Sequence, residues 1–145
     1  MNTEYPPAAG IIPYYKDLIT GRYHVLLGYE IAHKNWSGFV GKKETCDKTI
    51  KDTALREFTE ETGDVFKQYM YYFKRKLLNK SYIRYNTQNK IRHIHLFFIE
   101  IGSHIHITPI PKGLEKSQLK WFSVKDIKEN KVLKSLKVII LSLFN

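Results

Sequence analysis

Three glutamates lie within five positions of a chain that is otherwise short of acid. Glu57, Glu60 and Glu61 are three of its 14 acidic residues, and Arg56 directly precedes them. On an α-helix, residues four apart are rotated by about 40° and separated by about 6 Å, so the carboxylates of Glu57 and Glu61 point into the same space. Hard cations such as Mg²⁺ prefer oxygen ligands of this kind. The spacing is therefore compatible with a metal site, although a solvated acidic face is the commoner meaning of three glutamates on a helix.

The segment that carries these side chains has the signals of a helix at both ends. Thr49 followed by Asp52 has the spacing of a capping box. Gly63 tolerates the positive φ that often ends a helix. An apolar stripe at helical spacing is formed by Ile50, Ala54 and Phe58. On this helix Arg56 precedes Glu60 by four residues, so a salt bridge between them would fix one carboxylate.

Strand-like segments lie on both sides of this helix. Strands are expected over residues 8–15, 22–31, 81–85, 90–101 and 120–124, with a short strand or loop over 36–41. Residues 126–144 have helical spacing, whereas 69–78 fit a strand or a helix equally well. The interleaving predicts a single-domain mixed α/β sandwich with a short N-terminal tail (1–7) and one domain (8–145).

Composition limits the class of protein. The chain has 145 residues, and 43% of them are hydrophobic, which is enough for a core and excludes a fully disordered basic tail. Its formal net charge is +10. Its single cysteine, Cys46, cannot form an internal disulfide. It has no signal-peptide pattern and no apolar run near the roughly 20 residues of a membrane span, so we expect a cytoplasmic protein that makes no membrane contact. The lysine excess is either compositional drift or an adaptation to polyanionic partners.

The stretch from Gly41 to Gly63 resembles the Nudix box, G-x5-E-x7-R-E-U-x-E-E-x-G-U, where U is apolar. Residues 56–63 match R-E-U-x-E-E-x-G at every specified position. There are three departures: the loop before Arg56 is one residue longer, Asp47 is the best substitute for the first Glu, and Asp64 takes the last apolar position.

The resemblance extends over about residues 8–128. Residues 36–42 resemble the family's approach to the box, with Val40 in place of a common glycine, and residues 94–100 resemble its central strand. Glu115, six residues before Trp121, resembles its later E-x5-W segment.

This resemblance implies the Nudix α/β/α sandwich with a mixed β-sheet. It also implies hydrolysis, dependent on Mg²⁺ or Mn²⁺, of a phosphoanhydride in a nucleoside-diphosphate-linked substrate. The implied metal ligands are Glu57 and Glu61, with Glu60 as a further ligand or base oriented by Arg56. The site residues expected outside the helix are the bases Glu100 and Glu115, of which Glu115 is preferred, and the substrate-binding residues Gly41, Lys42 and Lys43.

Several alternatives stay open. The favoured substrates are a dinucleoside polyphosphate, a nucleoside triphosphate or a nucleotide sugar. The rivals are an RNA 5′ end, as in pyrophosphohydrolase or decapping activity, and a non-catalytic module that binds nucleotide or RNA. The pairs His93/His95 and His104/His106 have a zinc-compatible spacing but are interpreted as ordinary strand histidines. The tyrosines and lysines of 67–76 either stack bases or pack in the core. The oligomeric state is not predicted.

Overall fold

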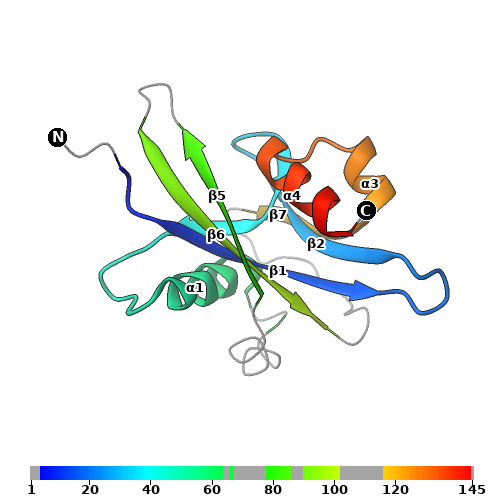
Figure 1. Ribbon diagram of the computed structural model, residues 1–145, viewed down its shortest axis with the longest axis horizontal. Coiled ribbons are helices and arrows are strands. Elements are labelled where there is room, and N and C mark those ends of the chain that lie inside the picture. The colour runs from blue at the N-terminus through cyan, green and yellow to red at the C-terminus, as the bar shows by residue number, and fades with distance from the viewer. Residues whose placement is uncertain (1–3, 64–65, 67–77, 86–89, 102–115, 145) are drawn as a thin grey trace.

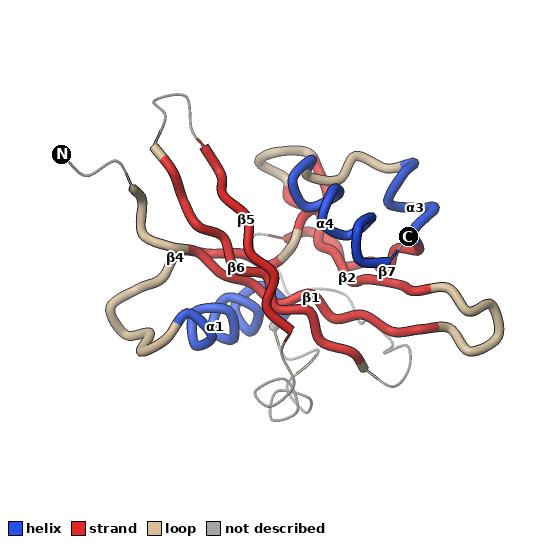
Figure 2. The backbone as a smooth tube through the Cα atoms, in the orientation of Figure 1, coloured by secondary structure: helices blue, strands red, loops and turns tan. Residues whose placement is uncertain are grey.

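The computed structural model describes residues 4–63, 66, 78–85, 90–101 and 116–144, and its elements are shown in Figures 1 and 2. The strands are β1 (Ala8–Lys16), β2 (Tyr23–Glu30), β3 (Asn35–Ser37), β4 (Phe39–Lys42), β5 (Leu78–Tyr85), β6 (Ile91–Glu100) and β7 (Lys116–Ser123). The helices are α1 (Ile50–Thr62), α3 (Val124–Glu129) and α4 (Lys134–Phe144). These strands form one seven-stranded mixed sheet.

Strand β1 organises this sheet. On one edge it runs parallel to β6 over residues 8–14. Its other edge is divided, because residues 8–11 pair with β4 and residues 14–16 pair with β2, both antiparallel. β2 also pairs with β3 and with β7, and β5 pairs with β6. The division brings β4, and the loop that follows it, to the N-terminal half of β1.

The core has two layers because side chains alternate between the two faces of each strand. In β1, Ala9 and Ile11 face the helix α1, whereas Ala8 and Ile12 face α3 and α4. Figure 1 shows α1 on one side of the sheet and α3 and α4 on the other. The expected α/β/α sandwich is therefore confirmed. No helix in the described part of the chain combines the length and apolarity needed to cross a bilayer.

Helix α1 begins and ends where the sequence predicts. Thr49 is the N-cap, and its hydroxyl accepts from the backbone N–H of Asp52 while the Asp52 carboxylate accepts from the backbone N–H of Thr49. Gly63 ends the helix with φ 64°, in the region that side-chain-bearing residues avoid. Phe58, on the stripe of α1 that faces the sheet, is fully buried and meets Phe39 edge to face at 5.3 Å. Local caps and the apolar stripe together set the register of this helix.

Residues 126–144, which have helical spacing in the sequence, form parts of two helices, α3 and α4, and not one continuous helix. Between α3 and α4, Val132 bridges to Trp36 and is buried. The backbone N–H of Trp36 donates to Lys131 O at 2.8 Å, and that of Leu133 donates to Trp36 O at 2.9 Å. This bridge to β3 interrupts the helix, and helical periodicity in the sequence does not reveal it.

The remaining differences lie at element ends. β7 begins earlier than expected and ends at Ser123, because Ser123 is the N-cap of α3. β5 extends back to Leu78. The ambiguous segment over 69–78 lies, apart from Leu78, outside the described residues, as do His104 and His106.

We predict that Phe58→Ala lowers the free energy of unfolding by about 3–5 kcal/mol, because it leaves a cavity between α1 and the sheet. Urea unfolding followed by circular dichroism measures this change. Ile19→Ala is the matched control, since Ile19 is 98% exposed. Equal unfolding midpoints for the two variants would contradict the assignment of Phe58 to the core.

Candidate functional site

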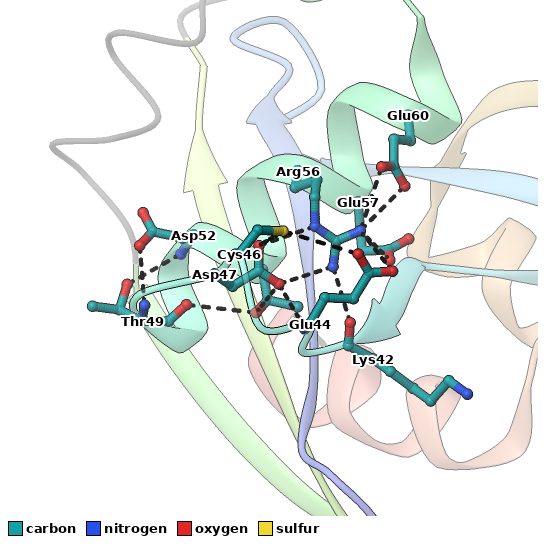
Figure 3. Close-up of polar contacts among 10 residues, drawn as sticks. Lys42, Glu44, Cys46, Asp47, Thr49, Asp52, Arg56, Glu57 and Glu60 are labelled. Atoms are coloured by element: carbon teal, nitrogen blue, oxygen red, sulfur yellow. Dashed lines mark hydrogen bonds and ion pairs between the residues drawn. The ribbon is translucent and has the colours of Figure 1, made fainter.

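The Arg56 guanidinium, from the middle of α1, is the centre of a polar cluster (Figure 3). Its Nε donates to Asp47 Oδ1 at 3.0 Å, and its Nη2 donates to Asp47 Oδ2 at 2.9 Å and to the Lys42 carbonyl at 3.0 Å. Its Nη1 donates to Glu57 Oε1 at 2.9 Å and to Glu60 Oε2 at 3.3 Å. All its N–H directions are used, so the side chain links the loop, β4 and α1.

Asp47 is the partner that holds Arg56 in place. It is 5% exposed. Besides Arg56, it accepts from the Thr53 hydroxyl at 2.9 Å and from the Glu44 backbone N–H at 3.0 Å. These bonds, above all those from Arg56, hold the pKa of the Asp47 carboxyl well below its usual range. Reciprocally, Asp47 raises the pKa of Arg56 above its ordinary value.

The sequence pointed to Asp47 only as a substitute within the motif, and it was not among the predicted site residues. The loop before Arg56, one residue longer than the motif, still delivers this carboxylate to the guanidinium. A tight turn helps, because the Asp47 backbone N–H donates to Glu44 O at 3.0 Å. The signal that identifies Asp47 is its place six positions after Gly41, with five residues between them, as in the motif G-x5-E.

Glu57 lies against the backbone of β4. A Cβ atom added to Gly41 would overlap the carboxylate group of Glu57. A side chain at this position would therefore displace the Glu57 carboxylate from its place beside β4. The predicted site residue Gly41 thus lies beside the predicted site residue Glu57, because α1 packs directly on β4.

Glu60 and Glu61 differ in their surroundings. The Glu60 side chain is 58% exposed and reaches Arg56, as the spacing of four residues predicted. Glu61 is 4% exposed, on the inner side of α1. Arg56 also meets a fourth carboxylate, that of the loop residue Glu44, at 3.8 Å. As placed, no three His, Cys, Asp or Glu side chains among the described residues are gathered closely enough to hold a metal ion.

The other predicted site residues are distributed less closely. Lys42 ends β4 and contributes its carbonyl to Arg56, while its exposed side chain points away from the guanidinium (Figure 3). Lys43 follows, with its backbone N–H bonded to Pro7 O at 2.8 Å. Glu100, a predicted base, is exposed at the last position of β6. Glu115 lies outside the described residues.

The described histidine pair lies on β6. His93 Nε2 is 3.8 Å from Glu4 Oε1. The pKa of His95 is lowered by burial and by the neighbouring His93. Both lie within β6, and their interpretation as ordinary strand histidines stays a prediction.

Comparison with known proteins places this arrangement in a wider context. Residues 4–142 match the family model described as NUDIX domain. No curated protein sequence matches the chain.

Several solved structures share the fold. One is the Ap4A hydrolase of C. elegans in a binary complex, at 16% identity and a TM-score of 0.69, covering 96% of this chain and 95% of that one. Another is the NUDIX domain of Shewanella oneidensis NrtR complexed with ADP ribose, at 15% identity and a TM-score of 0.68, covering 94% of this chain and 85% of that one. A third is the bifunctional NMN adenylyltransferase/ADP ribose pyrophosphatase of Francisella tularensis complexed with AMP and a Mn ion. Its sequence identity is 22% and its TM-score is 0.64, and the match covers 96% of this chain and 42% of that one.

We predict that Asp47→Asn destabilises the protein by about 2–3 kcal/mol at neutral pH, because Arg56 loses its ionic partner. A carboxyl whose pKa is lowered by folding stabilises the protein above its unfolded pKa, near the ordinary value of 3.8, and this contribution is lost as the pH falls further. The difference in unfolding free energy between wild type and Asp47→Asn should therefore shrink below about pH 4. Urea titrations from pH 7 to pH 3 measure it. A difference that is constant across this range would contradict the pairing.

Proposed function

The chain belongs to the NUDIX domain family, and from this premise we propose that it is a hydrolase that cuts a phosphoanhydride bond in a small nucleotide with the help of Mg²⁺ or Mn²⁺. The substrate is a nucleoside diphosphate linked to another group: a dinucleoside polyphosphate, a nucleoside triphosphate or a nucleotide sugar. The observation that carries the proposal is the cluster in which four carboxylates contact one guanidinium. This cluster keeps a negative charge in a chain of net charge +10, and a divalent cation neutralises such a charge.

The glutamates of α1 are suited to a hard cation. Glu57 and Glu61 would hold it, with Glu60 as a further ligand or as the base, since carboxylate oxygens suit Mg²⁺ and Mn²⁺. No three such side chains among the described residues converge on one point, so binding would draw these carboxylates together. Gly41 leaves the room that the Glu57 carboxylate occupies. Glu61 is 4% exposed, and a buried carboxylate is costly unless positive charge lies near it. A cation beside α1 therefore stabilises a group that folding has taken out of water.

The charged residues in the second half of α1 have distinct roles in the proposed reaction. When bound, the metal supplies positive charge to the phosphate oxygens and lowers the pKa of a coordinated water. Arg56 holds Glu57 and Glu60 in position before the substrate arrives, so little reorganisation is needed during reaction. Glu60, the most exposed of the three glutamates, accepts the proton of the attacking water. Glu115 is the alternative base and stays a prediction.

The chain near Gly41 suits phosphate groups. Lys42 and Lys43 follow this glycine directly, and their ammonium groups are matched to phosphate oxygens. The exposed Lys42 side chain is accessible to a ligand at the surface of the site. Lys43 is half-buried and its backbone is tied to Pro7, so Lys42 is the stronger candidate.

Small nucleotides are favoured over an RNA 5′ end by the structures that share this fold. One is an Ap4A hydrolase, and another is a NUDIX domain complexed with ADP ribose. Both compounds are small nucleotides with a phosphoanhydride linkage. Hydrolysis of an RNA 5′ end and binding without catalysis are the outcomes against which the proposal is tested.

We predict hydrolysis of at least one small nucleotide in a screen of dinucleoside polyphosphates, nucleotide sugars, nucleoside triphosphates and capped or triphosphorylated RNA, each with Mg²⁺ and with Mn²⁺. Chelation by EDTA should abolish turnover, and Glu57→Gln should lower kcat/KM by about 100-fold or more, since it removes a metal ligand. Glu129→Gln, on the exposed surface of α3, is the matched control. Turnover of RNA alone would overturn the substrate class, and absence of turnover with retained RNA binding would favour the binding module.

A second readout separates the metal from the reaction. Mg²⁺ at about 100 times its dissociation constant should stabilise the folded wild type by about 2.7 kcal/mol, which is measured as a rise in Tm. The double variant Glu57→Gln/Glu61→Gln should lose this rise. An equal rise in the double variant would contradict the assignment of the ligands.

We predict that Gly41→Ala lowers kcat/KM by about 100-fold, because its methyl group displaces the Glu57 carboxylate by about an ångström. Gly38→Ala is the matched control, since its Cβ would make only an ordinary contact of 3.5 Å with Ile12 Cδ1. Steady-state kinetics and circular dichroism separate this effect from unfolding. Equal activity of the two variants would sink the steric role of Gly41.

A further inference from the structure

Two adjoining cavities lie at the turn end of the β1–β2 hairpin, beside the C-terminal end of α4. The larger has a volume of about 340 Å³ and is lined by Gly21, Arg22, Tyr23, Val124, Lys125 and Phe144. The smaller, of about 180 Å³, is lined by Tyr14, Tyr23, Phe98, Leu143 and Phe144. Tyr23 and Phe144 line both, and we term the two adjoining cavities together the aromatic cavity.

The aromatic cavity is separate from the carboxylate site. Gly41 of β4 pairs with Ala9 of β1. Tyr14 lies five residues further along β1 than Ala9, which corresponds to about 17 Å along the strand. The two sites also lie on opposite faces of the sheet. Tyr14 and Phe144 pack in the layer of α3 and α4, while α1 covers the other face. The cavity is therefore no part of the proposed hydrolytic centre.

Aromatic rings form the walls of this cavity. The Phe144 ring lies 4.9 Å from that of Tyr14, 5.3 Å from that of Tyr23 and 5.9 Å from that of Phe98. Phe98 is buried, whereas the other three are only half-buried. Exposed ring surface of this kind offers a stacking contact to a planar ligand.

Cations surround the cavity and continue beyond it. Arg22 and Lys125 line it, and Lys16 Nζ lies 5.6 Å from the centre of the Tyr23 ring. The outer helices carry four lysines, Lys125 and Lys128 one turn apart on α3 and Lys134 and Lys137 one turn apart on α4, which we term the lysine row. The two pairs are adjacent, because Lys137 Nζ donates to Lys128 O at 3.2 Å.

The acidic residues of these helices do not cancel this charge. Only Asp126 and Glu129 lie on them. Asp126 is engaged at the helix start, where its Oδ2 accepts from the Ser123 backbone N–H at 3.0 Å. A surface with four lysines and an adjoining aromatic cavity matches the two features of a nucleotide strand, planar bases and a polyanionic backbone.

We propose that the aromatic cavity binds one base of a single-stranded nucleic acid, whose phosphates follow the lysine row. The base stacks on the rings of Tyr23 and Phe144, which a paired base in a duplex cannot reach. Arg22 and Lys125 contact the phosphates next to that base. The rings line a depression and do not project from the surface, which favours a planar ligand over insertion into a lipid bilayer. The proposal goes beyond the hydrolysis of small nucleotides and does not depend on it.

The test uses fluorescein-labelled single-stranded RNA and DNA of about twelve nucleotides, with a 5′-hydroxyl end and in EDTA, so that no phosphoanhydride or metal is present. Fluorescence anisotropy gives Kd at several salt concentrations. Lys125→Ala/Lys128→Ala should reduce the slope of log Kd against log salt by about 1.4, or about 0.7 for each lost phosphate contact. Lys48→Ala/Lys51→Ala removes the same charge near the start of α1 and should leave the slope close to that of wild type.

The stacking contact has its own variant. Phe144→Leu keeps an apolar side chain in the layer but removes the ring, and should weaken binding by about tenfold. The lysine variant should hydrolyse a small nucleotide at the wild-type rate, so failure of this proposal is distinguishable from failure of the proposed function.

Three results would overturn the proposal. One is equal loss of binding in the two double-lysine variants, which would show attraction to net charge alone. Another is full displacement of the oligonucleotide by AMP, which would assign the cavity to a free nucleotide. The third is sedimentation with phosphatidylserine vesicles in the absence of oligonucleotide binding, which would assign the surface to a membrane, with the exposed Leu18 and Ile19 of the hairpin tip as the inserted residues.

Discussion

The site depends on the pairing of the Arg56 guanidinium with the buried carboxylate of Asp47. A buried ion pair is stable only when its hydrogen-bonding groups are satisfied, and here the two side chains meet through two N–H···O bonds while the remaining donors of Arg56 reach β4 and the glutamates of α1. One planar group thus sets the distance between a loop, a strand and a helix. A lysine could not replace Arg56, because only the guanidinium group offers several N–H donors in a fixed planar arrangement.

That pairing is possible only because the core sets the register of α1. Phe58 and Ala54 are fully buried against the sheet, so a rotation of the helix would expose them to water. Arg56 and Glu57 then necessarily lie toward β4, where Gly41 presents no side chain. The apolar face of the helix therefore decides, at a distance, which carboxylates meet the guanidinium.

The two faces of the sheet differ in charge as well as in packing. α1 brings its glutamates to one layer, whereas α3 and α4 bring lysines to the other. β1 separates them, since its alternate residues belong to the two layers of the core. The net charge of +10 is therefore unevenly distributed, with a local acidic cluster that attracts a cation and a distant basic surface that attracts phosphate. Membership in the NUDIX family accounts for the acidic cluster of α1. It does not account for the basic surface of α3 and α4.

The sequence by itself determined α1, because a capping box, a terminal glycine and an apolar stripe are all interactions between residues near one another in the chain. It also determined the spacing of Glu57, Glu60 and Glu61, and through the motif the α/β/α fold. Only the tertiary structure decided that Asp47 anchors Arg56, that Val132 pairs with Trp36 and divides the last helix, and that Tyr23 meets Phe144 beside a cavity. Each of these contacts joins residues brought together by sheet pairing and core packing, and no local preference of the chain encodes such a meeting.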